Sequence, residues 1–259
     1  MLRSRGLEVA LTSALLTLAA ACGAQSQDQR QGSVSEATSA EQRPVLGLMG
    51  TIPIYWGESG SFGDLVDGTG DSHWVRDRIE KRFAIEPLDM LTDQNLAPLD
   101  MLLLAQPRAL GAPENVALDA WVRGGGRLLL FADPMLTGES RYAIGDRRRP
   151  QDVILLSPIL LHWGLDLQFD VDRPGGVETA RADGVGIPID RAGLFTVSPD
   201  GGCQISGGGV LARCLIGKGK VIVLADAALL DLHHPPPGAP EALDWLFEQA
   251  FGEIAGNNR

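Results

Sequence analysis

Residues 100–134 read DMLLLAQPRALGAPENVALDAWVRGGGRLLLFADP, and this stretch decides the fold class. The apolar run at 101–105 is long enough for a strand buried on both faces and too short for a helix. Pro113 suits the first turn of a helix, where its missing N–H is not needed, and the glycines at 124–126 are suited to end that helix. Residues 128–132 form a second apolar strand. A strand–helix–strand unit this short predicts a parallel crossover and therefore an α/β fold.

Further segments of the chain extend this sheet and its helices. Apolar runs at 45–54, 85–90 and 221–225 predict three more strands. Helical periodicity predicts one helix over 74–83 and a closing helix over 240–251, which presents an apolar stripe. The fold class is therefore α/β with a mostly parallel sheet.

The region between the central strands and the last strand is less regular. Ser72 is the expected N-cap of the first helix. Residues 153–163 are expected to be helical, with Pro158 breaking or restarting the helix, and 165–171 to return as a strand. Short β-prone pieces within 172–216 predict antiparallel hairpins that are inserted into the main sheet or added at its edge.

The N-terminal residues indicate export. Residues 1–21 combine two arginines, a short apolar stretch and small residues, as a signal peptide does, and Cys22 follows directly. This pattern resembles a bacterial lipobox, so we expect lipid attachment at Cys22 and a location at the periplasmic face of the cell envelope. The alternative is ordinary secretion as a soluble periplasmic protein, with Cys22 incidental. The apolar stretch is shorter than the ~20 residues that a membrane-spanning helix needs.

The remaining chain divides into three parts. Residues 22–43 are rich in Gln, Ser, Glu and Ala and are expected to form a disordered tether. Residues 44–252 are expected to form a single α/β domain, and 253–259 a polar tail. The formal charge of the whole chain is −11, which argues against nucleic-acid partners and against adhesion to anionic lipid headgroups.

The sequence resembles a known family at several points in order. The run LLLAQPRAL…ALDAWVRGGGRLLLFADP, together with LLSPILLHWGLDL and GKGKVIVLADAALLD, is similar to the auxiliary domain of GldG-type ABC transport systems and to the related GIFT domains. The resemblance implies a flavodoxin-like three-layer fold, like that of class I glutamine amidotransferases but without the catalytic cysteine. It also implies a role beside an ABC transporter permease and ATPase complex, or in a gliding-motility-like assembly. Family members are typically longer and end in a transmembrane helix, so anchoring is expected at the N-terminus here.

Polar and aromatic residues follow the predicted parallel strands, where open sheets bind ligands. Glu58, Trp56, Gln106, Asp133 and Asp226 form this candidate ligand rim. The two aspartates would bind a cation or a sugar or exchange protons. The alternative is that each aspartate only caps the turn that follows its strand. Trp56 has the same two interpretations, an exposed ligand contact or a packed side chain.

The sequence lacks the motifs of the common hydrolases and metal sites. No serine or cysteine lies in a nucleophile elbow of the G-x-S-x-G type, so we expect no catalytic residue. The pair His233-His234 lacks the i, i+4 spacing of metal ligands and precedes three prolines, so we expect no metal. No cofactor is expected either.

Three functional classes remain open on this basis. The first is a non-catalytic envelope lipoprotein that binds a partner or ligand and assists an ABC-type transport or gliding-motility-like assembly. The second is an envelope hydrolase that acts on a glycan or an amide through Asp133, Asp226 or Glu58. The third is a periplasmic solute-binding protein with its ligand at the sheet rim.

Cys203 and Cys214 bracket the segment QISGGGVLAR. Its three glycines favour a chain reversal between two short strands, which would place the cysteines nearly opposite each other and allow a disulfide. A register shifted by one residue would instead leave two free thiols on opposite faces.

Overall fold

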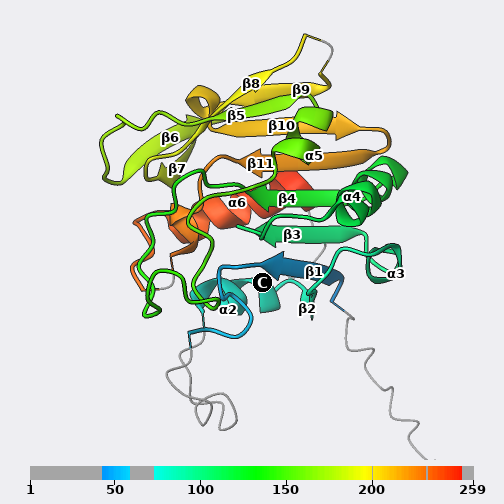
Figure 1. Ribbon diagram of the computed structural model, residues 1–259, viewed down its shortest axis with the longest axis horizontal. Coiled ribbons are helices and arrows are strands. Elements are labelled where there is room, and N and C mark those ends of the chain that lie inside the picture. Colours follow the sequence, from blue (N-terminus) through cyan, green and yellow to red (C-terminus); the bar gives the residue numbers. More distant parts are fainter. Residues whose placement is uncertain (1–42, 59–72, 200, 232, 253–259) are drawn as a thin grey trace, which may run out of the picture. The chain divides into compact units, whose positions relative to one another are not determined.

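Seven strands form the central sheet in the order β2-β1-β3-β4-β11-β10-β9 (Figure 1). The computed structural model describes residues 43–58, 73–199, 201–231 and 233–252. The five strands from β2 to β11 are parallel, and β10 and β9 continue the sheet antiparallel. The strands are β1 (Val45–Gly50), β2 (Ala84–Pro87), β3 (Met101–Ala105), β4 (Arg127–Phe131), β9 (Cys203–Ser206), β10 (Leu211–Ile216) and β11 (Gly219–Leu224).

The parallel unit predicted from residues 100–134 is confirmed. Strand β3 pairs with β4 in parallel, from Met101 opposite Arg127 to Ala105 opposite Phe131. Every residue of β3 is buried, because helices cover both faces of the sheet there. Strand β2 is shorter than predicted and ends at Pro87, a residue that cannot donate to a ladder.

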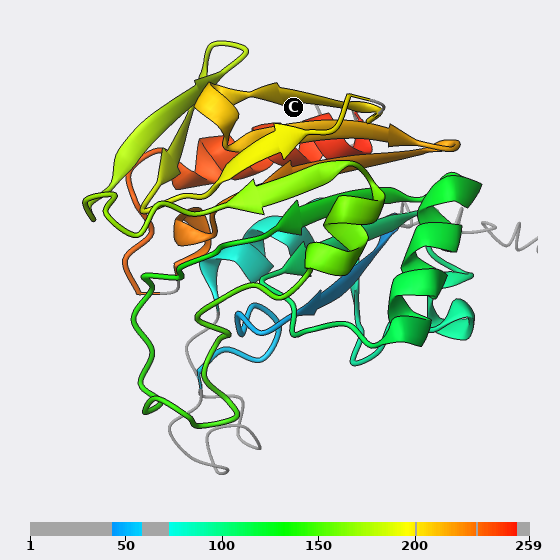
Figure 2. The same ribbon diagram turned by 45° about the horizontal axis from the view of Figure 1, so that its top comes forward.

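Helices cover the two faces of the sheet (Figures 1 and 2). On one face, α2 (Trp74–Glu80) and α6 (Ala239–Phe251) pack against alternate strand residues such as Leu103 and Leu129. On the other face, α3 (Asp93–Leu96), α4 (Ala112–Gly124) and α5 (Ser157–His162) pack with the intervening residues such as Leu102 and Leu128. This arrangement is the predicted flavodoxin-like three-layer fold.

Two helix predictions need correction. Helix α5 begins at Ser157 with Pro158 in its first turn, so residues 153–156 are not helical and the proline starts the helix. The N-cap of α2 is His73, whose Nδ1 accepts a hydrogen bond from the amide of Val75 at 3.2 Å. Ser72, the predicted cap, lies outside the described residues, as does Cys22. Helix α3, capped by Thr92, was not predicted.

Antiparallel pairs form in this region as predicted, but only β9 with β10 extends the edge of the main sheet, while two other pairs form separate two-stranded sheets. The strand expected at 165–171 ends at Gln168 and does not join the main sheet. Instead β5 (Leu165–Gln168) pairs with β8 (Leu194–Val197), while β6 (Glu178–Ala182) pairs with β7 (Val185–Ile189). Leu165 and Phe195 join the core beneath α4 and α5, whereas Ala180 and Ile187 join the core beneath α6. The two pairs therefore contribute to opposite faces of the central sheet.

The last two strands of the sheet form the hairpin that carries the two cysteines. Strands β9 and β10 are joined through the 3-10 turn η1 (Gly207–Gly209), in which all three glycines have positive φ. Cys203 pairs directly across from Cys214, and a disulfide joins them. A second 3-10 turn, η2 (Ala228–Leu230), follows β11.

No helix in the described part of the chain has both the length and the apolar character needed to cross a membrane.

Candidate functional site

The carboxyl ends of β1, β3, β4 and β11 lie along one edge of the sheet, because these strands are parallel neighbours. The chain passes from β1 to β2 on one side and then to β3 on the other side of β1. This reversal is a topological switch point, the place where open α/β sheets leave a crevice for a ligand. All five predicted rim residues follow one of these strands.

Gln106 follows β3 directly and is completely buried. Its φ of 49° is a left-handed conformation that a residue with a side chain adopts only when its surroundings impose it. Its Nε2 donates to the carbonyls of Asp133 and Gln151, both at 2.9 Å. Its Oε1 accepts from the amide of Asp133 at 2.8 Å. The side chain therefore bridges the ends of β3 and β4 and binds backbone groups only.

Thr51 completes this closure at the switch point. Its amide donates to the carbonyls of Ala105 and Gln106, and its hydroxyl donates to the Gln106 carbonyl at 2.5 Å. The same hydroxyl accepts from the amide of Gln151 at 2.9 Å. The position at the strand ends where a ligand would bind is therefore occupied by groups of Thr51, Gln106 and Gln151.

Asp133 is completely buried at the end of β4. Its Oδ1 accepts from the amide of Met135 at 2.8 Å and its Oδ2 from the amide of Ala227 at 3.0 Å. Burial raises the pKa of Asp133 to about 7, the nearby carboxylate of Asp190 adds to the rise, and the two amides oppose it. Its hydrogen bonds tie the loop after β4 to the loop after β11.

Asp226 is the corresponding residue at the end of β11, and it too is completely buried. Its Oδ1 accepts from the amide of Ala228 at 2.7 Å and its Oδ2 from the amide of Asp190 at 2.9 Å. Burial raises the pKa of Asp226 well above its ordinary value, and the charge of Asp133 raises it further. Both aspartates therefore cap turns, as one of the two sequence interpretations expected.

Glu58 lies apart from the two aspartates and joins three loops. Its Oε1 accepts from the hydroxyl of Ser140 at 2.6 Å and its Oε2 from the amide of Arg141 at 3.0 Å. The Nε2 of His233 lies 3.5 Å from Oε2. Burial alone would raise the pKa of Glu58, but the hydrogen bonds from Ser140, Arg141 and His233 outweigh it and lower the pKa below its ordinary value.

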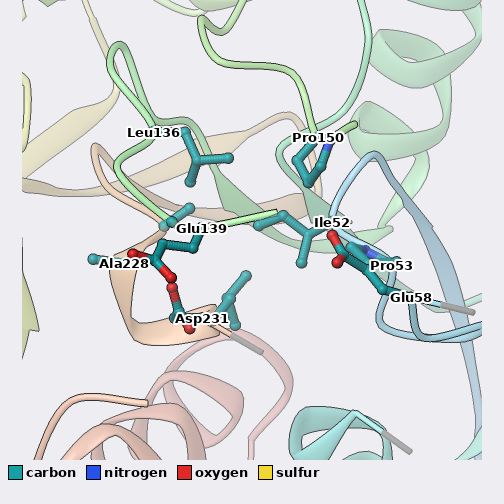
Figure 3. A pocket seen from close by; sticks show the side chains of 11 residues that line it. Ile52, Pro53, Glu58, Leu136, Glu139, Pro150, Ala228 and Asp231 are labelled. Carbon is teal, nitrogen blue, oxygen red and sulfur yellow. The ribbon is translucent and has the colours of Figure 1, made fainter. Parts of the chain in front are cut away.

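A small cavity lies beside Glu58 among the loops after β1, β4 and β11 (Figure 3). Glu139 and Asp231 lie on one side of it, and Glu58 lies on the other side with Ile52 and Pro53. The space open to the centres of water molecules is about 30 Å³. The cavity can therefore hold one or two water molecules but not a sugar ring.

Trp56 does not join any of these groups. Its side chain is 67% exposed, and its ring contacts the ring of Tyr55 edge to face at 4.8 Å between centroids. The packed interpretation of Trp56 is therefore wrong, and the structure places it neither in the cavity nor near Gln106. The predicted rim divides into the Gln106–Asp133–Asp226 cluster, the Glu58 junction and the exposed Trp56.

His73 is the other buried ionisable residue close to this edge. It is completely buried, and its desolvation lowers its pKa to about 4, although the charge of Asp231 opposes this shift. The imidazole is therefore neutral at pH 7, with Nδ1 as the acceptor that caps α2. Among the residues that the structure describes, no group of three or more His, Cys, Asp or Glu side chains is arranged to hold a metal ion.

Sequence reasoning missed the partners of the rim residues. Thr51, Ser140, Gln151 and Asp190 lie in loops without periodicity, so no pattern marks them. A signal was available only for Gln106, since a buried strand followed by a polar residue and a proline indicates a sharp turn.

Fold and site together define an α/β protein of flavodoxin-like, three-layer architecture whose switch-point crevice is filled by its own side chains. Residues 68–171 match the model of a family described as an ABC-type uncharacterized transport system. This match covers α2 to β5 and supports a role in ABC-type transport. No curated protein matches the chain.

Three solved structures of low sequence identity align with most of the chain. The mmIFT52 N-terminal domain is 13% identical, with a TM-score of 0.51 over 79% of this chain and 96% of that one, which shows the fold alone. A cytoplasmic protein from Salmonella typhimurium is 11% identical, with a TM-score of 0.49 over 80% of this chain and 98% of that one. A β-galactosidase from Bacillus circulans sp. alkalophilus is 12% identical, with a TM-score of 0.47 over 80% of this chain and 31% of that one.

Proposed function

We propose that this chain is a non-catalytic envelope lipoprotein that binds a protein partner and assists an ABC-type transport assembly, as a GldG-like or GIFT-like auxiliary domain. The match of residues 68–171 to the transport-system family carries this proposal. The partner would be the permease and ATPase complex of that system.

The conformation of Gln106 supports binding rather than catalysis. Hydrolases with α/β folds place a nucleophile on a strained turn after a central strand. Gln106 occupies such a turn after β3, but a carboxamide is no nucleophile, and its nitrogen and oxygen are both bound to backbone groups. Asp133 and Asp226 are likewise buried and bound to backbone amides. Turnover of an amide or a glycoside that is lost on Asp133→Asn would contradict a non-catalytic role.

Co-purification tests the transport role. We expect the full-length chain, solubilised from membranes in mild detergent, to bring down an ABC permease and its ATPase, and the genes of both to lie beside its own. A chain that brings down neither subunit, and has neither gene nearby, would contradict the proposal.

The membrane anchor is a separate part of the proposal. Cys22 would carry the lipid and hold the folded part at the periplasmic face, supported by the signal-like pattern of residues 1–21. A single acyl chain binds membranes only marginally, so stable anchoring requires the complete lipoprotein modification. We expect Cys22→Ala to move the protein from the membrane fraction to the soluble fraction. Ser26→Ala, four positions further on, is the control and should remain in the membrane fraction; equal distribution of both variants would exclude the anchor.

A further inference from the structure

Residues of the loop after β4, helix α5, strand β5 and its C-terminal end line an apolar groove. Its walls include Met135, Leu136, Ile144, Val153, Leu160 and Phe169, and its volume is about 670 Å³. This volume is within the range of sites that take up several side chains of a ligand or peptide. The groove is separate from the cluster around Gln106 and from the small cavity beside Glu58, with which it shares only Leu136.

The groove exposes large apolar side chains to solvent. Ile144 is 88% exposed, Val153 50% and Met135 37%. Leu155, between two groove residues, is 53% exposed. Exposed apolar side chains that line one groove are unfavourable in water, and such grouping is typical of interaction sites.

The charge of this region differs from that of the rest of the chain. Residues 134–169 contain four arginines and four carboxylates, whereas the whole chain has a net charge of −11. The charged residues in the groove wall are Arg149 and Asp152, which pair with each other at 3.2 Å.

The turn that supplies Ile144 and Arg149 to the groove also presents further arginines. Backbone hydrogen bonds from Asp146 to Ala143 and from Arg149 to Asp146 hold this turn together. Arg148 pairs with Asp146 at 2.7 Å. Arg147 is exposed and pairs with no carboxylate among the described residues. The groove is thus mainly apolar, and the turn that contributes Arg149 to its wall also carries Arg147, which is unpaired among the described residues.

We propose that this groove binds an amphipathic peptide segment of the protein partner, with apolar side chains in the groove and a carboxylate against Arg147. This inference rests on the proposed function, which requires a protein partner. Charge complementarity selects an acidic segment, because residues 143–152 carry three arginines against two aspartates in a chain whose net charge is −11. The same net charge opposes docking of the groove on an anionic bilayer.

Binding of defined peptides tests the inference without the transporter. The probes are three labelled 14-residue peptides: one with leucines on one helical face and glutamates at one end, one with lysines replacing the glutamates, and one with serines replacing the leucines. Fluorescence anisotropy with the purified full-length protein measures their affinities. We expect the glutamate peptide to bind about fivefold more tightly than the lysine peptide, and the serine peptide not to bind.

Variants identify the surface that is responsible. Ile144→Glu and Val153→Glu change exposed groove residues, so the fold should persist, and each should weaken binding of the glutamate peptide about tenfold or more. Arg147→Glu should abolish the preference for glutamate over lysine. Val116→Glu, on helix α4 with its side chain 70% exposed, is the matched control and should leave binding unchanged.

Three outcomes would overturn the inference. They are no binding of any peptide, equal loss of binding in Val116→Glu, and groove-dependent binding to vesicles of phosphatidylglycerol in place of peptide. Because the peptides require no transporter, these outcomes leave the co-purification test of the proposed function intact. Conversely, peptide binding without co-purification would contradict the transport role alone.

Discussion

The side chain of Gln106 and the backbone of Asp133 are hydrogen-bonded in both directions, with Nε2 to carbonyl at 2.9 Å and amide to Oε1 at 2.8 Å. The side-chain amide of Gln106 makes the two hydrogen bonds that the backbone of a further strand residue would make. The pairing of β3 with β4 therefore continues one residue beyond the ends of the two strands. The left-handed backbone of Gln106 is the conformational cost of this arrangement. The crevice at this end of the sheet is therefore filled by a glutamine, a residue type that no sequence pattern marks for this position.

Gln106→Ala should lower the free energy of unfolding by about 2–3 kcal/mol. The substitution leaves the buried amide and carbonyl of Asp133 without their partner. Gln106→Gly loses the same hydrogen bonds but accepts the positive φ, so it should be about 1 kcal/mol less destabilising than alanine. Urea denaturation measures both values. Gln204→Ala, on the exposed edge strand β9, is the control; an alanine effect no larger at 106 than at 204 would contradict the structural role.

The raised pKa values of Asp133 and Asp226 predict the direction in which the free energy of unfolding changes with pH. The folded-state pKa of Asp133 is about 7 and that of Asp226 lies well above the unfolded value of 3.8, so above that value the folded protein binds more protons than the unfolded chain. The stability that these groups contribute is therefore greatest at low pH and falls as the pH rises above about 4, for Asp133 until about pH 7. Each group contributes a slope of at most about 1.4 kcal/mol per pH unit.

Asp133→Asn tests this direction. The substituted amide does not titrate, so the fall in unfolding free energy between pH 4 and pH 7 should become shallower. The absolute stability should decrease as well, because Asn cannot accept at both positions where Asp133 accepts. Asp172→Asn, at an exposed position, should leave the profile unchanged. A slope as steep in Asp133→Asn as in the parent would show that Asp133 is ionised in the folded protein.

Glu58→Gln should loosen the loop after β4. The carboxylate receives the hydroxyl of Ser140, the amide of Arg141 and the ring of His233, and the neutral amide keeps at most part of these contacts. We expect amide hydrogen exchange in residues 136–152 to accelerate about tenfold, corresponding to about 1–2 kcal/mol. Glu139→Gln alters another carboxylate of the same cavity (Figure 3), is the matched control and should change exchange little.

Removal of the disulfide should destabilise the edge of the sheet. Cys203 and Cys214 lie 11 positions apart, so the closed loop is short and the expected loss in Cys203→Ala/Cys214→Ala is about 2–3 kcal/mol. Protein folded in an oxidising compartment should show no free thiol at either position when it is unfolded without reductant. Two reactive thiols would mean that the bridge does not form in solution.

The sequence predicted the central sheet because buried strands such as β3 and β4 are continuous apolar runs. It failed at β5, where the run continues to Val171 but the pairing partner, β8, lies far along the chain. Local periodicity contains no information about which sheet a short strand joins. The position of Pro158 shows the same limit, because a proline can end one helix or begin another.

The sequence predicted where the candidate site lies in the fold but not how its side chains are arranged. Parallel strand ends must share an edge, so the proximity of Gln106, Asp133 and Asp226 followed from topology. The inward direction of Gln106 and the contacts of Glu58 depend on loops whose course no local pattern specifies. For Trp56 the sequence left open a packed side chain and an exposed ligand contact, and the residue is 67% exposed.

The position of β11 has a consequence for how the chain reaches its native state. This strand lies between β4 and β10, although residues 132–218 separate it from β4 in the chain. The chain emerges from its N-terminus, in synthesis or in export, so strands β1 to β4 appear first, and β4 presents an unpaired, apolar edge until residues 219–224 follow. Long-range pairing of this kind folds slowly, and an exposed edge during that interval favours aggregation. The chain should therefore depend on a chaperone that shields β4 until the C-terminal segment arrives.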